Sequence, residues 1–307
     1  MQHDFKVHKE SVDVNGIPYE LETGKWARQA DGSVILRWGD MLLMANATGA
    51  KKSGEGLDFF PMTVEYREKY YAGGRFPGGF LKRENRPSDK EILVSRVIDR
   101  PIRPLFPDNY FNEVQIFITL LSAQKNFSAD VHAITAASAA LTISGLPFDG
   151  PVAGVRIARV AGKFILFPNR DEIQASDINL ALAGTAKAVT MIEGLADEAS
   201  EEDMIAAVKH GHEEIKRLCE MQLKFKAKAG KPRIEIAPAP DHSELRKRIA
   251  DLGLTAMKQA NEIKGKFERQ TAIDATKKSV LEHFKPEFAN LEKEEKRKQE
   301  KLVKSLI

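Results

Sequence analysis

The residues best suited to chemistry gather in one basic and aromatic segment, residues 67–106. It holds ten lysines and arginines against five acidic residues, whereas the rest of the chain is slightly acidic. Four aromatic residues lie among these charges: Tyr70, Tyr71, Phe76 and Phe80. Because phosphates attract cations and unstacked bases pack on flat apolar faces, this mixture is typical of a surface that binds single-stranded nucleic acid.

A glycine-rich loop, residues 73–84, forms the centre of that segment. Its four glycines within seven residues disfavour a regular helix or strand and leave Phe80 and Arg83 exposed at a loop tip. Composition alone favours a plainer interpretation, a flexible surface loop with ordinary solvated charges. The loop is not a nucleotide-binding P-loop, because no Gly-Lys-Ser or Gly-Lys-Thr follows it.

Two further arginines, Arg100 and Arg103, alternate with prolines. The prolines reduce the entropy lost when guanidinium groups hold an anion, so this pair could clamp a phosphate. A helix-ending turn with structural ion pairs explains the same residues equally well. The predicted RNA-binding residues are Arg75, Phe80, Lys82, Arg83, Arg100 and Arg103.

Other polar groups are weaker candidates. His210 and His212 are two residues apart on an expected helix, so they point to different faces and make a poor metal pair. Asp171, Glu172 and Asp177 could form a metal site of their own, but acidic residues in a loop are usually only solvated. We therefore predict no metal ligands in this chain.

The composition is that of an ordinary globular protein. With 307 residues, 42% of them hydrophobic, the chain can bury one large domain or two of average size. The net charge of +3 by itself implies no polyanionic partner. The single cysteine, Cys219, excludes an internal disulfide and favours a reducing, cytoplasmic location. The N-terminus has no apolar leader, and the longest apolar run, residues 133–143, is too short to span a bilayer.

Hairpin strands open the expected fold. Two short strands within residues 12–23 meet at Asn15-Gly16, a dipeptide that tolerates positive φ, and residues 33–38 pair with 41–48. A further strand at 59–66 completes what we expect to be an antiparallel start.

A capped helix then follows the basic loop. Ser88 and Glu91 have the spacing of a capping box. Pro101 should stop this helix near Asp99. Its expected inward residues are Ile92, Leu93, Val97 and Ile98.

Alternating strands and helices continue to a linker, which indicates an α+β class. The expected elements are a strand at 114–121, an alanine-rich helix at 131–144, a hairpin of 152–160 with 163–167, strands at 179–183 and 188–193, and a long helix from Ser200. Glycine and proline near residue 235 divide the chain into an α+β domain, 1–235, and an all-helical domain, 236–307. The charged run 292–301 favours a solvated helix. The apolar residues after it suggest that this helix is cut short, so we expect a fragment.

Three stretches are specific enough to indicate a family: FFPMTVEY at 59–66, AGGRFPGGF at 72–80 and IDRPIRPLF at 98–106. Together they resemble the first half of bacterial polynucleotide phosphorylase. The resemblance implies a ribonuclease PH-like core, of the ribosomal protein S5 domain 2-like type, joined to an all-helical domain and assembled in a homotrimeric ring. It also implies that Phe80, Lys82 and Arg83 line the entrance of the ring and hold single-stranded RNA.

The reaction that the resemblance implies is phosphorolysis, in which inorganic phosphate attacks the 3′-terminal phosphodiester of RNA and Mg2+ is the cofactor. In active cores of the family a Gly-Ser-Ser-Ser run holds phosphate, and an Asp-Phe-Lys strand supplies an acid and a cation. The matching stretches here are Phe127-Ser128-Ala129-Asp130 and Asn179-Leu180-Ala181. Because Asp130 would repel phosphate and the strand lacks both charged groups, we expect no catalytic residues in this core.

Two functions remain open. In the first, the chain is the N-terminal part of a polyribonucleotide nucleotidyltransferase that turns over mRNA in the cytoplasm, with partners in RNA degradation, and it threads RNA and builds the trimer. In the second, it is a self-standing, non-catalytic RNA-binding ring subunit. A reading frame that continues past Ile307 into a second such core would favour the first.

Overall fold

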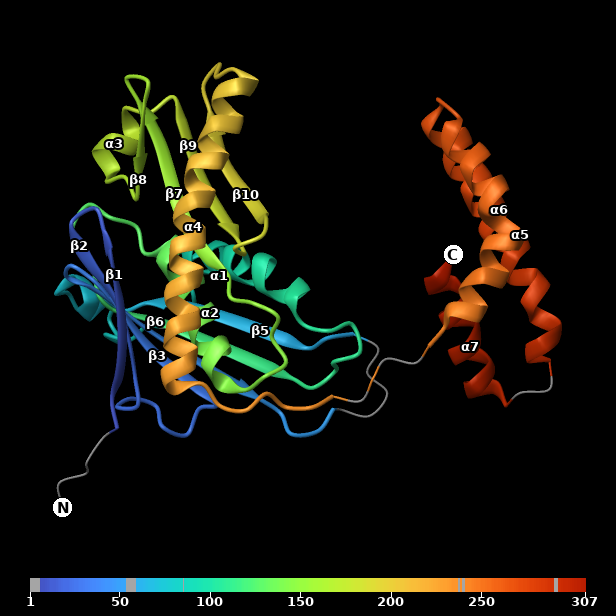
Figure 1. Ribbon diagram of the computed structural model, residues 1–307, viewed down its shortest axis with the longest axis horizontal. Helices are drawn as coiled ribbons and strands as arrows, with labels where there is room; N and C mark the ends of the chain where they lie inside the picture. Colours follow the sequence, from blue (N-terminus) through green and yellow to red (C-terminus); the bar gives the residue numbers. More distant parts are fainter. Residues whose placement is uncertain (1–5, 54–58, 85, 237, 239–240, 290–291) are drawn as a thin grey trace. The chain divides into compact units, whose positions relative to one another are not determined.

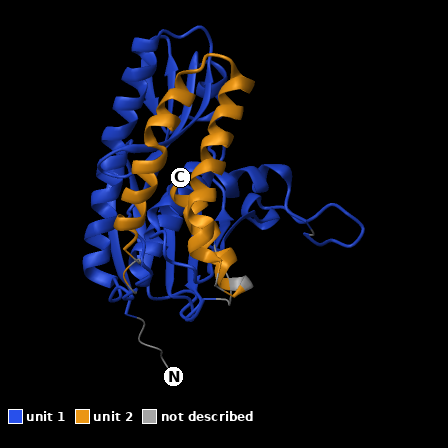
Figure 2. Ribbon diagram, turned by 90° about the vertical axis from the view of Figure 1, so that its right-hand side faces the viewer, with its two compact units in different colours: residues 1–237 blue, residues 238–307 orange. Residues whose placement is uncertain are grey.

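The computed structural model describes residues 6–53, 59–84, 86–236, 238, 241–289 and 292–307 (Figure 1). The chain divides into two compact units, residues 1–237 and 238–307 (Figure 2). Within the described ranges, no helix is both long and apolar enough to cross a membrane.

A six-stranded sheet forms one layer of unit 1, in the order β1-β2-β3-β4-β6-β5. Its strands are β1 (His8–Val14), β2 (Ile17–Thr23), β3 (Gly32–Trp38), β4 (Met41–Gly49), β5 (Met62–Glu68) and β6 (Val114–Ser122). The Asn15-Gly16 turn is confirmed, since these residues have φ of 54° and 75°. The expected antiparallel start is wrong at β5, which pairs parallel to β6. A parallel pair needs a long crossover, and here the basic loop and a helix form it.

A four-stranded antiparallel sheet forms the second layer, in the order β10-β9-β7-β8. Its strands are β7 (Ala153–Val160), β8 (Lys163–Leu166), β9 (Ile178–Gly184) and β10 (Val189–Ala196). A short helix, α3 (Arg170–Gln174), connects β8 to β9. These strands confirm the hairpin and the two later strands that the sequence predicts.

Two helices connect the sheets. Helix α2 (Asp130–Ser144) contacts β3, β4 and β7, and all its residues after Asp130 are buried. Its packing against β7 is close, because a Cβ added at Gly154 would lie 2.4 Å from the carbonyl oxygen of Val131. Helix α4 (Glu201–Ala229) begins after Ser200, as predicted, and lies along β7 and β1 (Figure 1).

Helix α1 (Asp89–Ile102) follows the basic loop, and its capping box is confirmed. Ser88 Oγ accepts a hydrogen bond from Glu91 N, and Glu91 Oε2 accepts one from Ser88 N. The predicted end near Asp99 is wrong, because Pro101 lies in the last turn, where its missing N–H removes only one backbone hydrogen bond. A 3-10 turn, η2 (Arg103–Leu105), continues from the helix.

The inward face of α1 also differs from the prediction. Ile98 is buried as expected, but Ile92 and Leu93 are exposed, and Val94 and Ile102 take core positions instead. The apolar residues near the start of the helix are numerous enough to fit two faces, so periodicity alone did not select the correct one.

Unit 2 is all-helical, as predicted. It comprises α5 (Ser243–Glu262), α6 (Lys266–Phe284), the 3-10 turn η3 (Lys285–Phe288) and α7 (Lys293–Leu306). Its small core consists of Ile249, Val280, Phe284, Phe288 and Val303. Residues 295–301, all charged except Gln299, lie on α7 with partly or fully exposed side chains, which confirms a solvated helix over that stretch.

Candidate nucleic-acid interface

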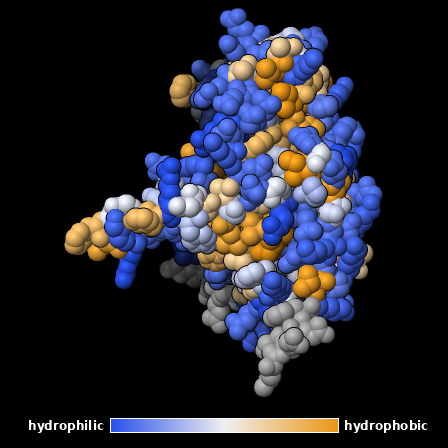
Figure 3. All heavy atoms as spheres, turned by 90° about the vertical axis from the view of Figure 1, so that its left-hand side faces the viewer, coloured by the Kyte–Doolittle hydropathy of each residue, from blue (hydrophilic) through white to orange (hydrophobic). Residues whose placement is uncertain are grey.

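The glycine-rich loop projects from the body of unit 1 (Figure 2). It follows a 3-10 turn, η1 (Tyr70–Gly73), which ends at Gly74 with a φ of 66°. Phe80 is 99% exposed and Phe76 73% exposed. Apolar and charged side chains lie side by side on this projection (Figure 3). The described residues therefore present ring faces that the protein core does not use.

The loop is closed at its base by Glu84. One carboxylate oxygen accepts from Lys69 Nζ at 2.6 Å, and the other accepts from the backbone N of Tyr70 at 2.8 Å. The hydrogen bond from Lys69, followed by the one from Tyr70, holds the pKa of Glu84 below its usual range. The two ends of the loop are thus joined by a charged contact, while its tip stays open.

Two adjoining hollows continue from the loop along β5 and α1. The larger has a volume of about 790 Å³ and the smaller about 380 Å³, and they share Glu65 and Arg67. Six arginines line them: Arg67, Arg75, Arg83, Arg86, Arg96 and Arg100. Five carboxylates line them too: Glu65, Glu68, Glu84, Glu91 and Asp99. Glu65 lies 3.7 Å from Arg67, and the other four accept hydrogen bonds from protein donors. The surface that remains is suited to an extended polyanion.

The structure brings several predicted residues to this surface. Arg75 and Arg83 line the larger hollow, and Arg100 lines the smaller, where its Nη1 lies 3.2 Å from a Glu193 carboxylate oxygen. Lys82 Nζ lies 5.1 Å from the centre of the Phe76 ring. The loop and both hollows therefore each contain at least one predicted residue.

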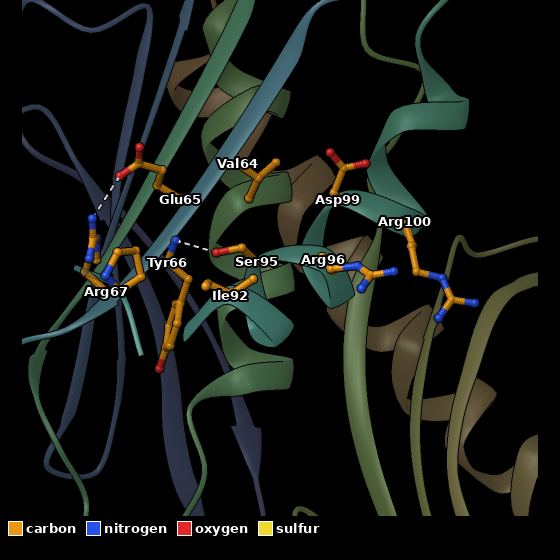
Figure 4. A pocket seen from close by; sticks show the side chains of 10 residues that line it. Val64, Glu65, Tyr66, Arg67, Ile92, Ser95, Arg96, Asp99 and Arg100 are labelled. Carbon is orange, nitrogen blue, oxygen red and sulfur yellow. Dashed lines mark hydrogen bonds and ion pairs between the residues drawn. The ribbon is translucent and has the colours of Figure 1, made fainter. Parts of the chain in front are cut away.

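Sequence reasoning missed Arg96. It lines the smaller hollow beside Arg100, and the two side chains extend in the same direction from successive turns of α1 (Figure 4). Their spacing of four residues places them on one helix face, which is the signal that could have identified Arg96.

Arg103 differs from the other predicted residues. Its Nε donates to Asp99 Oδ1 at 2.7 Å, its Nη1 to the carbonyl of Phe60 at 3.0 Å, and its Nη2 to the carbonyl of Met62 at 2.9 Å. All three donor nitrogens bind protein atoms, which connects Arg103 to α1, to the segment before β5 and to the first residue of β5. This guanidinium has a structural role, in line with the second of the two readings of the arginine-proline stretch.

A second notable site lies at the start of α2, where the predicted phosphate-repelling residue is found. Asp130 Oδ2 accepts from Arg156 Nη2 at 2.6 Å, and Arg156 Nη1 donates to Asn179 Oδ1 at 2.9 Å. Burial tends to raise the pKa of Asp130, but the charge of Arg156 and the hydrogen bond from Val131 N outweigh it, so the pKa is lowered. Asp130 is therefore an ionised carboxylate held by a guanidinium.

The space beside this ion pair is small. The cavity lined by Ser128, His132 and Arg156 has a volume of about 10 Å³, close to that needed for one water molecule. His132 is fully buried, and burial lowers its pKa to about 4, so it is neutral near pH 7. The cavity that Ser128 lines therefore has room for about one water molecule, and the imidazole beside it is uncharged.

Three of the remaining polar candidates, Glu172, Asp177 and His212, have polar protein partners. Glu172 Oε2 accepts from Asn169 N in the cap of α3, and Asp177 forms an ion pair with Arg159 at 2.7 Å. His212 Nε2 lies 3.0 Å from the carbonyl oxygen of Thr185. Among the residues that the structure describes, no three His, Cys, Asp or Glu side chains converge in a way that could hold a metal ion. These residues do not fit Mg2+.

The fold is that of a ribonuclease PH-type domain. Rice (Oryza sativa) Rrp46 matches it with a TM-score of 0.52 at 16% sequence identity, over 72% of this chain and 95% of that one. Models of the 3′ exoribonuclease family match residues 17–147 with domain 1 and residues 150–214 with domain 2. The predicted fold class is confirmed.

Relatives narrow this class to one family. The RNA-binding domain of polyribonucleotide nucleotidyltransferase matches residues 244–307. The polyribonucleotide nucleotidyltransferase of Leptospira biflexa is 47% identical over 86% of this chain, and that of Bacillus pumilus is 45% identical over 91%. This chain belongs to the polyribonucleotide nucleotidyltransferase family. It spans 38% of the length of the first of these relatives and 40% of the second.

Proposed function

We propose that this chain is the RNA-gripping part of a phosphate-dependent 3′-to-5′ exoribonuclease and that its own core does no chemistry. The observation that carries the first half is the solvent-exposed ring of Phe80 beside two adjoining arginine-lined hollows. Family membership supports it, because the relatives are named for nucleotidyl transfer on polyribonucleotides.

RNA would be held by stacking and by charge. Bases of a single strand pack against Phe80 and Phe76, which need no rearrangement because both rings already lie in solvent. Phosphates follow Lys82, Arg83 and Arg75 into the larger hollow. Stacking and phosphate contacts involve the base faces and the backbone, which all RNA sequences share, so binding should tolerate most sequences, as RNA turnover requires.

Beyond the loop, the strand would pass towards α1. The hollows share Arg67, so a backbone that leaves the larger one meets Arg96 and Arg100 next. Arg100 would exchange its exposed pair with Glu193 for a phosphate, which costs little because such surface pairs are weak. The path thus runs from a stacking tip to a pair of guanidinium groups on one helix face.

We propose that the core is catalytically inactive because a carboxylate of the chain itself occupies the place where phosphate would bind. Phosphorolysis needs a cradle for phosphate and an acid near the leaving oxygen. Here the Asp130 carboxylate occupies the start of α2 and binds Arg156, and the neutral amide of Asn179 completes the contact. A phosphate brought to the start of α2 would meet the negative charge of Asp130, and the cavity that Ser128 and Arg156 line there has a volume of only about 10 Å³.

Catalysis, with its phosphate and Mg2+, therefore belongs to a second core outside this chain. A homotrimeric ring, the cytoplasmic turnover of mRNA and partners in an RNA-degradation complex are parts of the same proposal. The ring would bring several copies of the loop to one entrance, where they could act on a single strand.

RNA binding tests the first half. We expect Phe80→Ala with Lys82→Ala and Arg83→Ala to weaken binding of oligo(A) by about 1–3 kcal/mol for one lost stack. The slope of log K against log salt should become shallower by about 0.7 for each lost phosphate contact. A matched control is Leu223→Ala with Lys224→Ala and Lys226→Ala, three exposed residues of α4 that line neither hollow. Equal affinity of the triple variant and the control would place the RNA path elsewhere.

Phosphorolysis tests the second half. Purified chain incubated with oligo(A), Mg2+ and inorganic phosphate should release no ADP. Rapid release of ADP would overturn the silent core. If that release were lost in Asp177→Asn, the acidic residues near α3 would again be candidates for a metal site.

A further inference from the structure

The turn between β2 and β3 exposes a tryptophan. The chain has two tryptophans, of which Trp38 is buried and Trp26 is 50% exposed. The Lys25 ammonium lies 5.3 Å from the centre of the Trp26 ring. A large flat ring with a cation against its face is a ready platform for a base and its phosphate.

Trp26 stands at the edge of a basic hollow of about 290 Å³. The cations that line it come from three places in the sequence: Lys6, Arg28 and Lys231. Among the lining residues that the structure describes, the carboxylate is that of Asp31, which accepts a hydrogen bond from Gly49 N at 2.8 Å. The hollow therefore carries a positive balance of charge next to an exposed indole.

The platform is held in place by backbone contacts. Gly24 has a φ of 99°, and a Cβ added there would lie 2.1 Å from the carbonyl oxygen of Lys6, so the N-terminal segment runs directly against the turn. Ala30 N donates to the carbonyl of Ala27 at 3.0 Å. Lys231 Nζ donates to the carbonyls of Ala30 and Asp31. The turn is braced from both sides, so Trp26 would lose little freedom on binding.

We propose that Trp26 and the basic hollow beside it form a second nucleotide-binding site, in which a base stacks on the indole and its phosphate contacts the cations. The ligand is a nucleotide of single-stranded RNA, and this choice rests on the proposed function. The site does not use the 73–84 loop, so the two can fail separately. A strand that occupies both sites would be held at two points of one chain, which raises affinity without any new contact at the loop.

The exposed indole also supplies the assay. Base stacking should quench the fluorescence of Trp26, whereas Trp38 is shielded in the core. Full chain titrated with oligo(A) should show saturable quenching, and the Phe80, Lys82 and Arg83 triple alanine variant should still show it at higher oligo(A) concentration. Trp26→Phe should abolish the quenching but keep most of the affinity for labelled oligo(A), because it retains a ring.

Trp26→Ala should weaken oligo(A) binding about fivefold or more, the lower limit for one stacked base, with an unchanged melting temperature because the side chain is half exposed. Titration with ADP distinguishes the source of the ligand. If oligo(A) half-saturates the quenching at a lower concentration than ADP does, the site binds RNA. If ADP does so at the lower concentration, the site binds free nucleotides through the same chemistry. Absence of quenching by both ligands, or unchanged oligo(A) affinity in Trp26→Ala, would overturn the proposal. If the Phe80, Lys82 and Arg83 triple alanine variant bound oligo(A) as tightly as the unchanged chain while the quenching persisted, the loop function proposed above would be refuted and this site would stand.

Discussion

Removing the carboxylate of Asp130 should create an empty anion site, and this is the sharpest test of the silent core. The side chains of Asp130 and Arg156 are 16% and 18% exposed. Deleting one partner of a buried ion pair costs about 3–5 kcal/mol, and their partial exposure reduces this to about 2–3 kcal/mol in Asp130→Ala. For a unit of this size, that loss corresponds to a fall of about 4–12 °C in melting temperature.

Inorganic phosphate should then partly restore the variant. The freed Arg156 guanidinium and the N-terminal end of α2 both favour an anion, and the missing side chain leaves space for one. At a concentration ten times its Kd, phosphate would add about 1.4 kcal/mol of stability, or about 3–6 °C. The assay is thermal unfolding in phosphate and in chloride at matched ionic strength.

The control is Asp177→Ala. It also removes a carboxylate from an arginine, but Arg159 keeps an ion pair with Asp203 at 2.6 Å, so no uncompensated guanidinium is left. We expect no specific phosphate effect in this control or in the unchanged chain. If phosphate stabilised the unchanged chain as much as Asp130→Ala, the carboxylate would not fill the anion site and the reasoning would fail.

Three further outcomes are expected. Glu84→Gln should loosen the base of the loop and weaken oligo(A) binding severalfold while the melting temperature stays constant; a change in melting temperature alone would make Glu84 purely structural. Arg103→Ala should lower the free energy of unfolding by about 2 kcal/mol through its lost hydrogen bonds and leave RNA affinity unchanged. Arg100→Ala should weaken RNA binding and leave the free energy of unfolding unchanged. Unfolding and binding are measured on both variants, and the opposite pattern would contradict the roles assigned to the two arginines. His132, with a pKa of about 4 in the folded chain against about 6.5 when unfolded, binds its proton first in the unfolded state, so stability should be highest above pH 6.5 and fall by on the order of 3 kcal/mol as pH drops to 4. Urea unfolding at several pH values should show this slope, and a His132→Leu variant should lack it.

Residue types and spacings within short stretches of the sequence were enough to predict most helices and strands and the exposed loop. The Asn15-Gly16 turn, the Ser88 capping box and the end of α2 at Gly145 all depend on atoms within a few residues, so residue type and spacing predict them. The exposure of Phe80 follows in the same way from the glycines around it, which provide no side chains to cover the ring.

Contacts between distant residues were decided only by the tertiary structure. Arg100 and Arg103 are three residues apart, yet the first lines a hollow and the second binds Asp99 and the segment before β5, because that segment lies beside only one of them. The sequence predicts that Asp130 opposes phosphate, but its partner Arg156 lies 26 positions further along the chain, and Asn179, which binds Arg156, lies 49 positions further. These residues come together only because β7 and β9 pack against α2. Sequence alone thus determined which side chains are available, since that depends on neighbours along the chain. The fold decided which of them bind the protein and which are left for a ligand, since that depends on what packing brings within a few ångströms.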